Sequence, residues 1–291
     1  MQRAWWILLY SLLGCLQVAQ ADVVVKFVKV ADSVFTQPDP RAAVWQQATP
    51  VTIPLLPQTI TTPSRFTPSV TTLEARAIHN GTWLAVLVRW VDPTRDEVTA
   101  SSQFSDAVAI GFPHGDAMTV SPFMGNAGGR VEINYWKALW QRDIERGFQD
   151  VTDLHPRTVV DMYWGTTAKA PYPVPETLAT PQALQWSPAI ARGNPMSQLQ
   201  RRTPVEQLIA EGFGTLTTQQ QQDTVSAGSY RNGAWSVMFS RKLQTGDAAD
   251  VVLQPATTSA INFAVWDGHS GDRSGQKNYA MWSPLVLEAT Q

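Results

Sequence analysis

The chain has 291 residues and a formal net charge of −2 at pH 7, from 22 Lys and Arg against 24 Asp and Glu. With no run of basic residues, nucleic acid is not the expected partner. Cys15 is the only cysteine, which excludes disulfides, Cys-ligated iron–sulfur clusters, zinc–thiolate sites and covalent c-type haem, because that haem needs a Cys-x-x-Cys-His motif. Twelve tryptophans indicate large flat surfaces to cover: a core, a planar cofactor, a sugar or another subunit.

Residues 1–21 have the pattern of a secretory signal peptide. Arg3 precedes an apolar run at Ala4–Leu16, and Ala19-Gln-Ala21 matches a small-x-small cleavage site. We expect cleavage after Ala21 and a periplasmic mature protein of residues 22–291, since no later apolar run is long enough to cross a membrane. The alternative is a lipoprotein box at Leu12-Leu-Gly-Cys15, which would make Cys15 a lipidated terminus.

The first half of the mature chain predicts strands. Asp22–Val30 alternates lysines with apolar residues, as an edge strand does. Residues 73–79 and 82–90 flank Asn80-Gly81, which is a strong hairpin signal, and His79 beside the turn is expected to be exposed. Asp106–Phe112 predicts a buried strand. It is followed by the glycine-rich loop Ser121–Arg130, which contains Met124.

The second half begins irregularly and then returns to strands. Residues 150–225 read as an elaboration within one domain, with a short helix at Thr203–Ala210 whose Thr203 and Glu206 would form a capping box. Residues 234–243, 260–267 and 279–287 predict strands. Many short strands between Gly and Pro turns favour an all-β antiparallel β-sandwich with short helices and long loop insertions, as one domain over residues 22–291.

No hydrolase, phosphate-loop, zinc-protease or dinucleotide motif is present, and the four histidines share no metal-ligand spacing. Two loops that follow strands hold an unusual residue each: Met124 after residues 106–112 and Lys277 after residues 260–267. A methionine is usually a core filler and a lysine in a polar glycine-rich loop is usually solvated, so neither residue alone indicates a site.

A family resemblance unites the two loops. The residues Pro122-Phe-Met-Gly125, Asn134-Tyr-Trp136, Val265-Trp-Asp-Gly268, Asp272-Arg-Ser-Gly-Gln-Lys277 and Trp282 resemble the haem-binding γ subunits of periplasmic molybdenum enzymes. That family includes ethylbenzene dehydrogenase, dimethyl sulfide dehydrogenase, chlorate reductase and selenate reductase. The resemblance implies one non-covalent haem b with axial ligands Met124 and Lys277. It also implies electron transfer between an iron–sulfur β subunit, beside a molybdenum-containing catalytic α subunit, and an external carrier such as a soluble cytochrome c.

Several alternatives stay open from sequence. His269 is the main competitor of Lys277 as an iron ligand, and Met118 and Met281 lie close to the two proposed ligands. Tyr135, Trp136 and Trp282 are candidates to line the haem faces, and Arg130 and Arg273 to pair with its propionates. The competing function is a β-sandwich that binds carbohydrate through its tryptophans, without haem.

Overall fold

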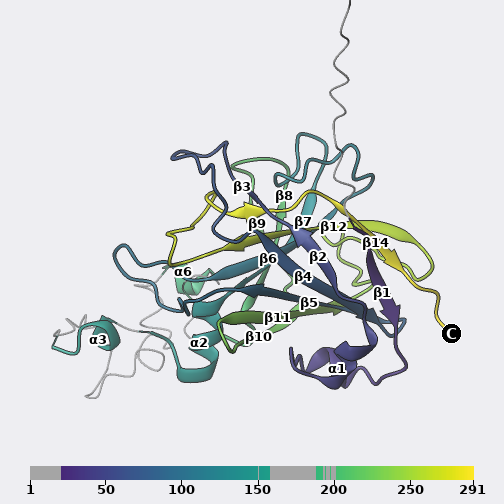
Figure 1. The fold of residues 1–291 in the computed structure, drawn as a ribbon, viewed down its shortest axis with the longest axis horizontal. Coiled ribbons are helices and arrows are strands. Elements are labelled where there is room, and N and C mark those ends of the chain that lie inside the picture. Colours follow the sequence, from purple (N-terminus) through teal and green to yellow (C-terminus); the bar gives the residue numbers. More distant parts are fainter. Residues whose placement is uncertain (1–20, 150, 158–187, 193, 195–196, 198–200) are drawn as a thin grey trace, which may run out of the picture.

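The computed structural model describes residues 21–149, 151–157, 188–192, 194, 197 and 201–291 (Figure 1). The predicted signal peptide and the lipoprotein alternative at Cys15 therefore fall outside the described residues, apart from Ala21. Strands dominate the described chain, and short helices lie at its margins (Figure 1). None of the helices in these ranges combines the length and apolar character needed to cross a membrane.

The strands form two layers. In the first layer the order is β10 (Val225–Tyr230), β11 (Ala234–Lys242), β5 (Trp83–Val91), β4 (Thr72–His79), β1 (Val23–Phe27), β14 (Ser283–Leu287) and the start of β12 (Thr258–Trp266), with β2 (Val51–Pro54) beside β4. The second layer continues from the end of β12 to β6 (Ala107–Pro113), β7 (Val131–Lys137), β8 (Val205–Ala210) and β9 (Thr217–Thr218), with β13 (Asn278–Tyr279) and β3 (Leu56–Pro57) on its other side. The helical segments are α1 (Ser33–Thr36), η1 (Ala43–Gln47), α2 (Ala138–Arg146), α3 (Val151–Leu154) and α6 (Pro188–Ala191).

Strand β12 joins the two layers. Its residues 258–261 pair with β14 in the first layer, and its residues 262–266 pair with β6 in the second. A strand that changes partners in this way makes a corner of a sandwich. The predicted all-β sandwich with short helices is confirmed, and its pairing is antiparallel except at β1.

The prediction that residues 22–30 form an edge strand is wrong. It pairs in parallel with β14 on one side and with β4 on the other. Lys26 therefore does not protect a free edge, and its ammonium instead lies 3.1 Å from a Glu288 carboxylate oxygen.

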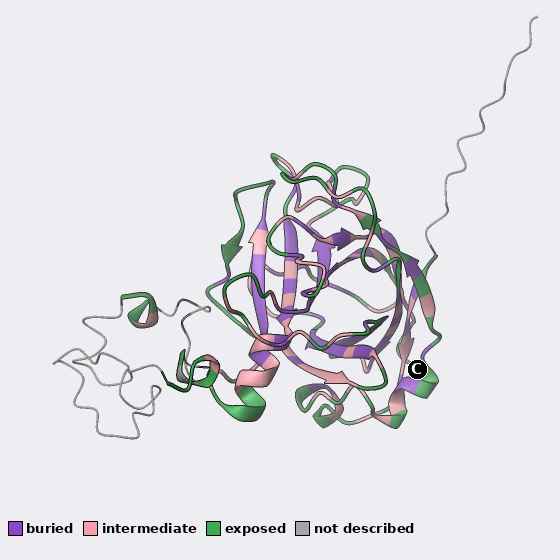
Figure 2. Ribbon diagram, turned by 60° about the vertical axis from the view of Figure 1, so that its left-hand side comes forward, coloured by how far each residue is buried: buried purple, intermediate pink, exposed green. Residues whose placement is uncertain are grey.

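The main core lies between the layers, where successive side chains alternate between the core and the opposite face. Trp90 and Trp235 are 1% exposed and Trp136 is fully buried. Their rings pack together, with centroids 6.3 Å apart for Trp90 and Trp235 and 5.1 Å apart for Trp136 and Trp235. These tryptophans fill part of the interior of the protein. Figure 2 shows that the strands around this interior are largely buried.

The predicted helix at Thr203–Ala210 is wrong, because this segment contains strand β8, which lies between β7 and β9. The Thr203 hydroxyl accepts a hydrogen bond from the backbone N–H of Ser226 rather than capping a helix. Pairing on both sides outweighs a weak local helix signal, since tertiary contacts commonly override propensity.

The hairpin of β4 and β5 is confirmed. The Asn80 side-chain oxygen accepts hydrogen bonds from the N–H groups of Thr82 and Trp83, and Gly81 has φ +94°. His79, expected to be exposed, is fully buried and packs against Phe27. Burial lowers the pKa of His79, so its ring is held in the neutral form.

Candidate cofactor site

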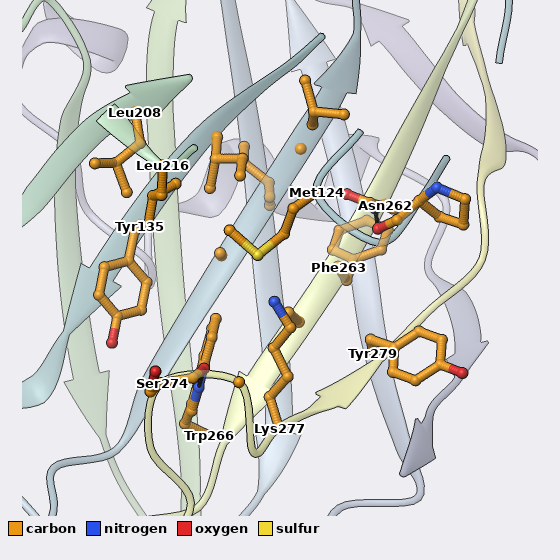
Figure 3. Close-up of a pocket in the computed structure, with 18 of the residues that line it drawn as sticks. Met124, Tyr135, Leu208, Leu216, Asn262, Phe263, Trp266, Ser274, Lys277 and Tyr279 are labelled. Carbon is orange, nitrogen blue, oxygen red and sulfur yellow. Dashed lines mark hydrogen bonds between the residues drawn. The ribbon is translucent and has the colours of Figure 1, made fainter. Parts of the chain in front are cut away.

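The face of the second layer that points away from the main core forms the floor of a cavity of about 360 Å³ (Figure 3). This face carries its own apolar cluster, separate from the main core and centred on Ala107, Ala109 and Trp266. Small residues at Ala109, Gly111 and Ala264 keep the floor low, which leaves room above the strands. The walls and rim come from loops and from the neighbouring strands, through Met124, Tyr135, Leu208, Phe213, Leu216, Asn262, Trp266, Ser274, Lys277 and Tyr279.

The loop that carries Met124 is fixed to the strands around it. The Met124 carbonyl accepts a hydrogen bond of 2.8 Å from the N–H of Gly212. The Asn262 side chain donates one of 2.9 Å to the carbonyl of Pro122. Gly111 permits this second contact, because a Cβ there would lie 2.3 Å from the Asn262 oxygen. Sequence-distant segments thus hold the loop in place over the cavity.

Met124 itself has a left-handed backbone conformation, with φ +69°. For a residue with a Cβ this conformation costs roughly 1–2 kcal/mol relative to the ordinary helical region. Glycine would adopt it freely, as Gly125 does beside it at φ +80°. A methionine at this position is therefore explained by its side chain, which reaches into the cavity (Figure 3).

Lys277 enters the cavity from the opposite loop, which follows β12. The backbone carbonyl of Lys277 accepts a hydrogen bond from the Gln58 N–H, and the carbonyl of Ser274 accepts one from the Trp266 indole. The Lys277 ammonium nitrogen lies 5.2 Å from the centre of the Trp266 ring. Figure 3 shows its Nζ directed toward the Met124 sulfur.

The electrostatic setting of Lys277 is unusual. Among the described residues, its Nζ makes no hydrogen bond and no ion pair, and no carboxylate lines the cavity. Burial lowers the pKa of Lys277 to about 8, because the cavity disfavours the charged ammonium. Once Lys277 is deprotonated, its amine and the Met124 thioether are both electron-pair donors, so the two loops can supply a pair of metal ligands across one apolar space.

The other residues singled out from the sequence separate into two groups. Tyr135 lines the cavity, and burial raises the pKa of its phenol. Trp136 lies in the main core instead, and Trp282 braces the chain before the Met124 loop by donating a 2.7 Å hydrogen bond to the Val120 carbonyl. Neither tryptophan lines the cavity.

The rival ligands lie outside the cavity. His269 is exposed, Met118 is 91% exposed and Met281 is 42% exposed. Arg130 and Arg273 are also exposed, and the Arg273 guanidinium lies over the Phe104 ring at 4.6 Å. None of these five lines the space that Met124 and Lys277 share.

The cavity also includes three residues that the sequence did not indicate, namely Asn262, Phe213 and Leu216. Strand alternation could have indicated Asn262, since it faces opposite to the buried Ile261 and Phe263. Phe213 and Leu216 lie in a loop, where no periodicity marks them.

The family model and the sequence comparisons indicate the same group of proteins. Residues 42–278 match the family model described as ethylbenzene dehydrogenase, a range that includes both Met124 and Lys277. The chlorate reductase subunit gamma of Ideonella dechloratans is 25% identical over 268 residues, which cover 91% of this chain and 84% of that protein. A protein of Haloferax mediterranei, named as the heme subunit of a respiratory nitrate reductase, is 22% identical over 245 residues, or 84% of this chain and 66% of that protein.

Among solved structures, a family 9 carbohydrate binding module from Caldicellulosiruptor kristjanssonii aligns with a TM-score of 0.40 and 8% identity. The alignment covers 93% of this chain and 97% of that one.

Proposed function

Because the chain belongs to the ethylbenzene dehydrogenase family, we propose that it is an electron-transfer subunit that binds one haem b between Met124 and Lys277. The observation that carries the proposal is that these two donors, which come from separate loops, both line one apolar cavity. When bound, the haem would supply one-electron exchange at its iron.

The residues present fit this cofactor. At pH 7, removing the proton from a lysine with the ordinary pKa of 10.5 requires about 4.8 kcal/mol, at about 1.36 kcal/mol per pKa unit. With the pKa lowered to about 8, the same step requires about 1.4 kcal/mol. The cavity thus lowers the free energy needed to deprotonate Lys277 before any iron is bound.

The two ligands also define what kind of haem site this would be. If Met124 and Lys277 both held the iron, no coordination position would remain for oxygen or substrate. A thioether ligand tends to raise the reduction potential. The apolar residues around the pair, such as Phe213, Leu216 and Trp266, would cover the faces of the haem. Such a site transfers electrons and does not itself catalyse substrate chemistry.

Assembly with other subunits is supported by the names of two relatives, a gamma subunit of chlorate reductase and a heme subunit of a respiratory nitrate reductase. The proposed complex contains a molybdenum-bearing α subunit and an iron–sulfur β subunit, with a soluble cytochrome c as the external electron carrier. The proposed location is the periplasm, supported by the signal-peptide pattern of residues 1–21.

The carbohydrate-binding alternative finds no support in the tryptophans. A sugar-binding platform needs aromatic rings that face solvent, but each tryptophan in the described part of the chain is buried or partly buried. Trp90, Trp136 and Trp235 lie in the main core, and Trp140 is also buried.

The haem content of the purified chain tests the proposal. After expression with adequate haem, we expect one haem b per chain and a low-spin absorption spectrum. Lys277→Leu should abolish the low-spin spectrum, whereas Lys29→Leu, at an exposed lysine, should leave it unchanged. A protein without a Soret band, or a Lys277→Leu variant that stays low-spin, would contradict the proposal.

A further inference from the structure

A cluster of three aspartates lies at the end of the sandwich from which the Lys277 loop departs. Asp92 follows β5, Asp106 precedes β6 and Asp267 follows β12. One carboxylate oxygen from each lies within 4.8 Å of the others. We call these three residues the aspartate triad. Asp106 is fully buried and Asp92 is 2% exposed.

Within the part of the chain that the structure describes, no cation forms an ion pair with the triad. None of the ion pairs among the described residues involves any of its members. Buried carboxylates are ordinarily paired with a cation or bound to a metal, because an isolated buried charge is strongly unfavourable. Two buried carboxylates beside the half-buried Asp267 therefore require an explanation.

An unpartnered atom gives the second observation. The Oδ1 atom of Asp92 accepts hydrogen bonds from the N–H and hydroxyl of Thr94, both at 3.1 Å. Its Oδ2 atom is buried without a hydrogen bond of ordinary length, and the Trp90 indole, which also lacks such a partner, interacts with the Asp92 carboxylate and lowers its pKa. A second buried carboxylate oxygen without a partner belongs to Asp96, whose N–H donates to Asp106.

Asp106 differs from Asp92 in being held firmly by the protein. Its Oδ1 accepts a hydrogen bond from the Gly268 N–H at 2.9 Å. Its Oδ2 accepts from the Asp96 N–H at 2.8 Å and from the Trp235 indole at 2.9 Å. These donors orient the carboxylate without neutralising its neighbours, so the triad combines one fixed carboxylate with one that has a free oxygen.

We propose that the aspartate triad binds a calcium ion. Hard oxygen ligands without histidine or cysteine suit Ca²⁺ or Mg²⁺ rather than a transition metal. Ca²⁺ takes six to eight oxygens at about 2.3–2.6 Å, so oxygens on opposite sides of it lie about 4.6–5.2 Å apart. The triad oxygens, which lie within 4.8 Å of one another, fit this separation. Mg²⁺ instead prefers to keep several waters, which a triad with two buried members does not favour.

Crowded and buried carboxylates repel one another, so the triad needs either a cation or a proton. Burial raises the pKa of Asp106 to about 8, with a further contribution from the charge of Asp92. Burial also raises the pKa of Asp92. Without a cation, the carboxylates would have to share a proton, which is the competing explanation.

The position of the triad gives the ion a structural role. Asp267 begins the loop that ends at Lys277, and its carboxylate also binds the N–H and hydroxyl of Ser270. Gly268 is tied to Asp106, and the Asp272 N–H to the carbonyl of Asp267. A calcium ion here would fasten the Lys277 loop to the ends of β5 and β6. Because this claim concerns the fold of the haem-free chain, it can be tested without haem.

Calcium binding to the purified full chain is measured in two ways after treatment with a chelator. The first is the melting temperature during titration with Ca²⁺, which we expect to rise by several degrees. The second is luminescence of Tb³⁺, a calcium substitute, on excitation of tryptophan. The Trp235 indole nitrogen lies 2.9 Å from Asp106, so terbium in the triad should emit strongly.

Two variants and a control assign the site. Asp92→Asn and Asp267→Asn should each weaken Ca²⁺ binding at least tenfold, whereas Asp116→Asn, at an exposed aspartate, should not change it. Should a triad variant fail to fold, the titration of the unmodified chain decides alone. The proposal is overturned if Ca²⁺ neither raises the melting temperature nor displaces terbium, if Mg²⁺ acts as strongly as Ca²⁺, or if the Asn variants are more stable with no dependence on Ca²⁺, as a shared proton would predict.

Discussion

Replacing Lys277 by leucine should stabilise the haem-free protein while it destroys the haem site. The pKa of Lys277 is lowered from 10.5 to about 8 by burial, and about 2.5 pKa units correspond to about 3 kcal/mol. This is the unfavourable free energy of keeping an ammonium in the cavity at neutral pH. Because the residue as a whole is partly exposed, we expect Lys277→Leu to raise the free energy of unfolding by about 1–3 kcal/mol.

The pH dependence of this difference has a definite sign. The folded pKa lies below the unfolded pKa, so the penalty is complete below pH 8 and fades between about pH 8 and 10.5. Above that range both states hold a neutral amine and the penalty is gone. The stability gain from Lys277→Leu should therefore be largest at pH 7 and should shrink as the pH rises toward 10.

Urea unfolding of the haem-free chain at pH 7.0, 8.5 and 10.0 measures the difference, with Lys29→Leu as the control for loss of a surface charge. The reasoning would be refuted if Lys277→Leu destabilised the haem-free protein at pH 7. A difference independent of pH would refute it equally, because a solvated Lys277 would behave in that way.

Substitutions at three positions test other parts of the structure. Met124→Gly should leave the melting temperature of the haem-free chain unchanged or higher, because glycine accepts the φ of +69°. Met124→Leu should keep the backbone strain. Both variants should lose the low-spin haem spectrum, whereas the control Met118→Ala should retain it. Gly125→Ala should destabilise the chain by about 2 kcal/mol or more, since its Cβ would lie 2.3 Å from the Gly129 carbonyl oxygen; an unchanged urea midpoint would contradict this. Glu132→Gln should cost about 3–5 kcal/mol, measured by urea unfolding, because it leaves the buried Arg241 guanidinium without the carboxylate that lies 2.6 Å away; a loss below about 1 kcal/mol would show that the pair is not needed.

The sequence reveals the strands of this fold better than their partners. Asn80-Gly81 and the alternating residues around it predict β4 and β5 because a hairpin is defined by local chemistry. The segment Thr203–Ala210 misleads because a capping pattern is also local, while the pairing of β8 with β7 and β9 is not. The interior position of β1 is likewise set by contacts with β4 and β14, far away in the chain.

In the candidate site, too, local sequence signals do not reveal contacts between distant residues. Met124 and Lys277 are separated by more than half of the chain, and only the family resemblance brought them together from sequence. Of the three aromatic candidates to line the haem, Tyr135, Trp136 and Trp282, only Tyr135 lines the cavity. Neighbours in a strand face opposite sides, so Trp136 points into the core for the same reason that Tyr135 points away from it.

The crystal structure of the haem-loaded chain, with the iron located by its anomalous scattering, tests the central claim most directly. We predict that the iron lies in the cavity and is bonded to the sulfur of Met124 and the Nζ of Lys277. Iron bonded to His269 or to any other side chain, or haem found outside this cavity, would contradict the claim.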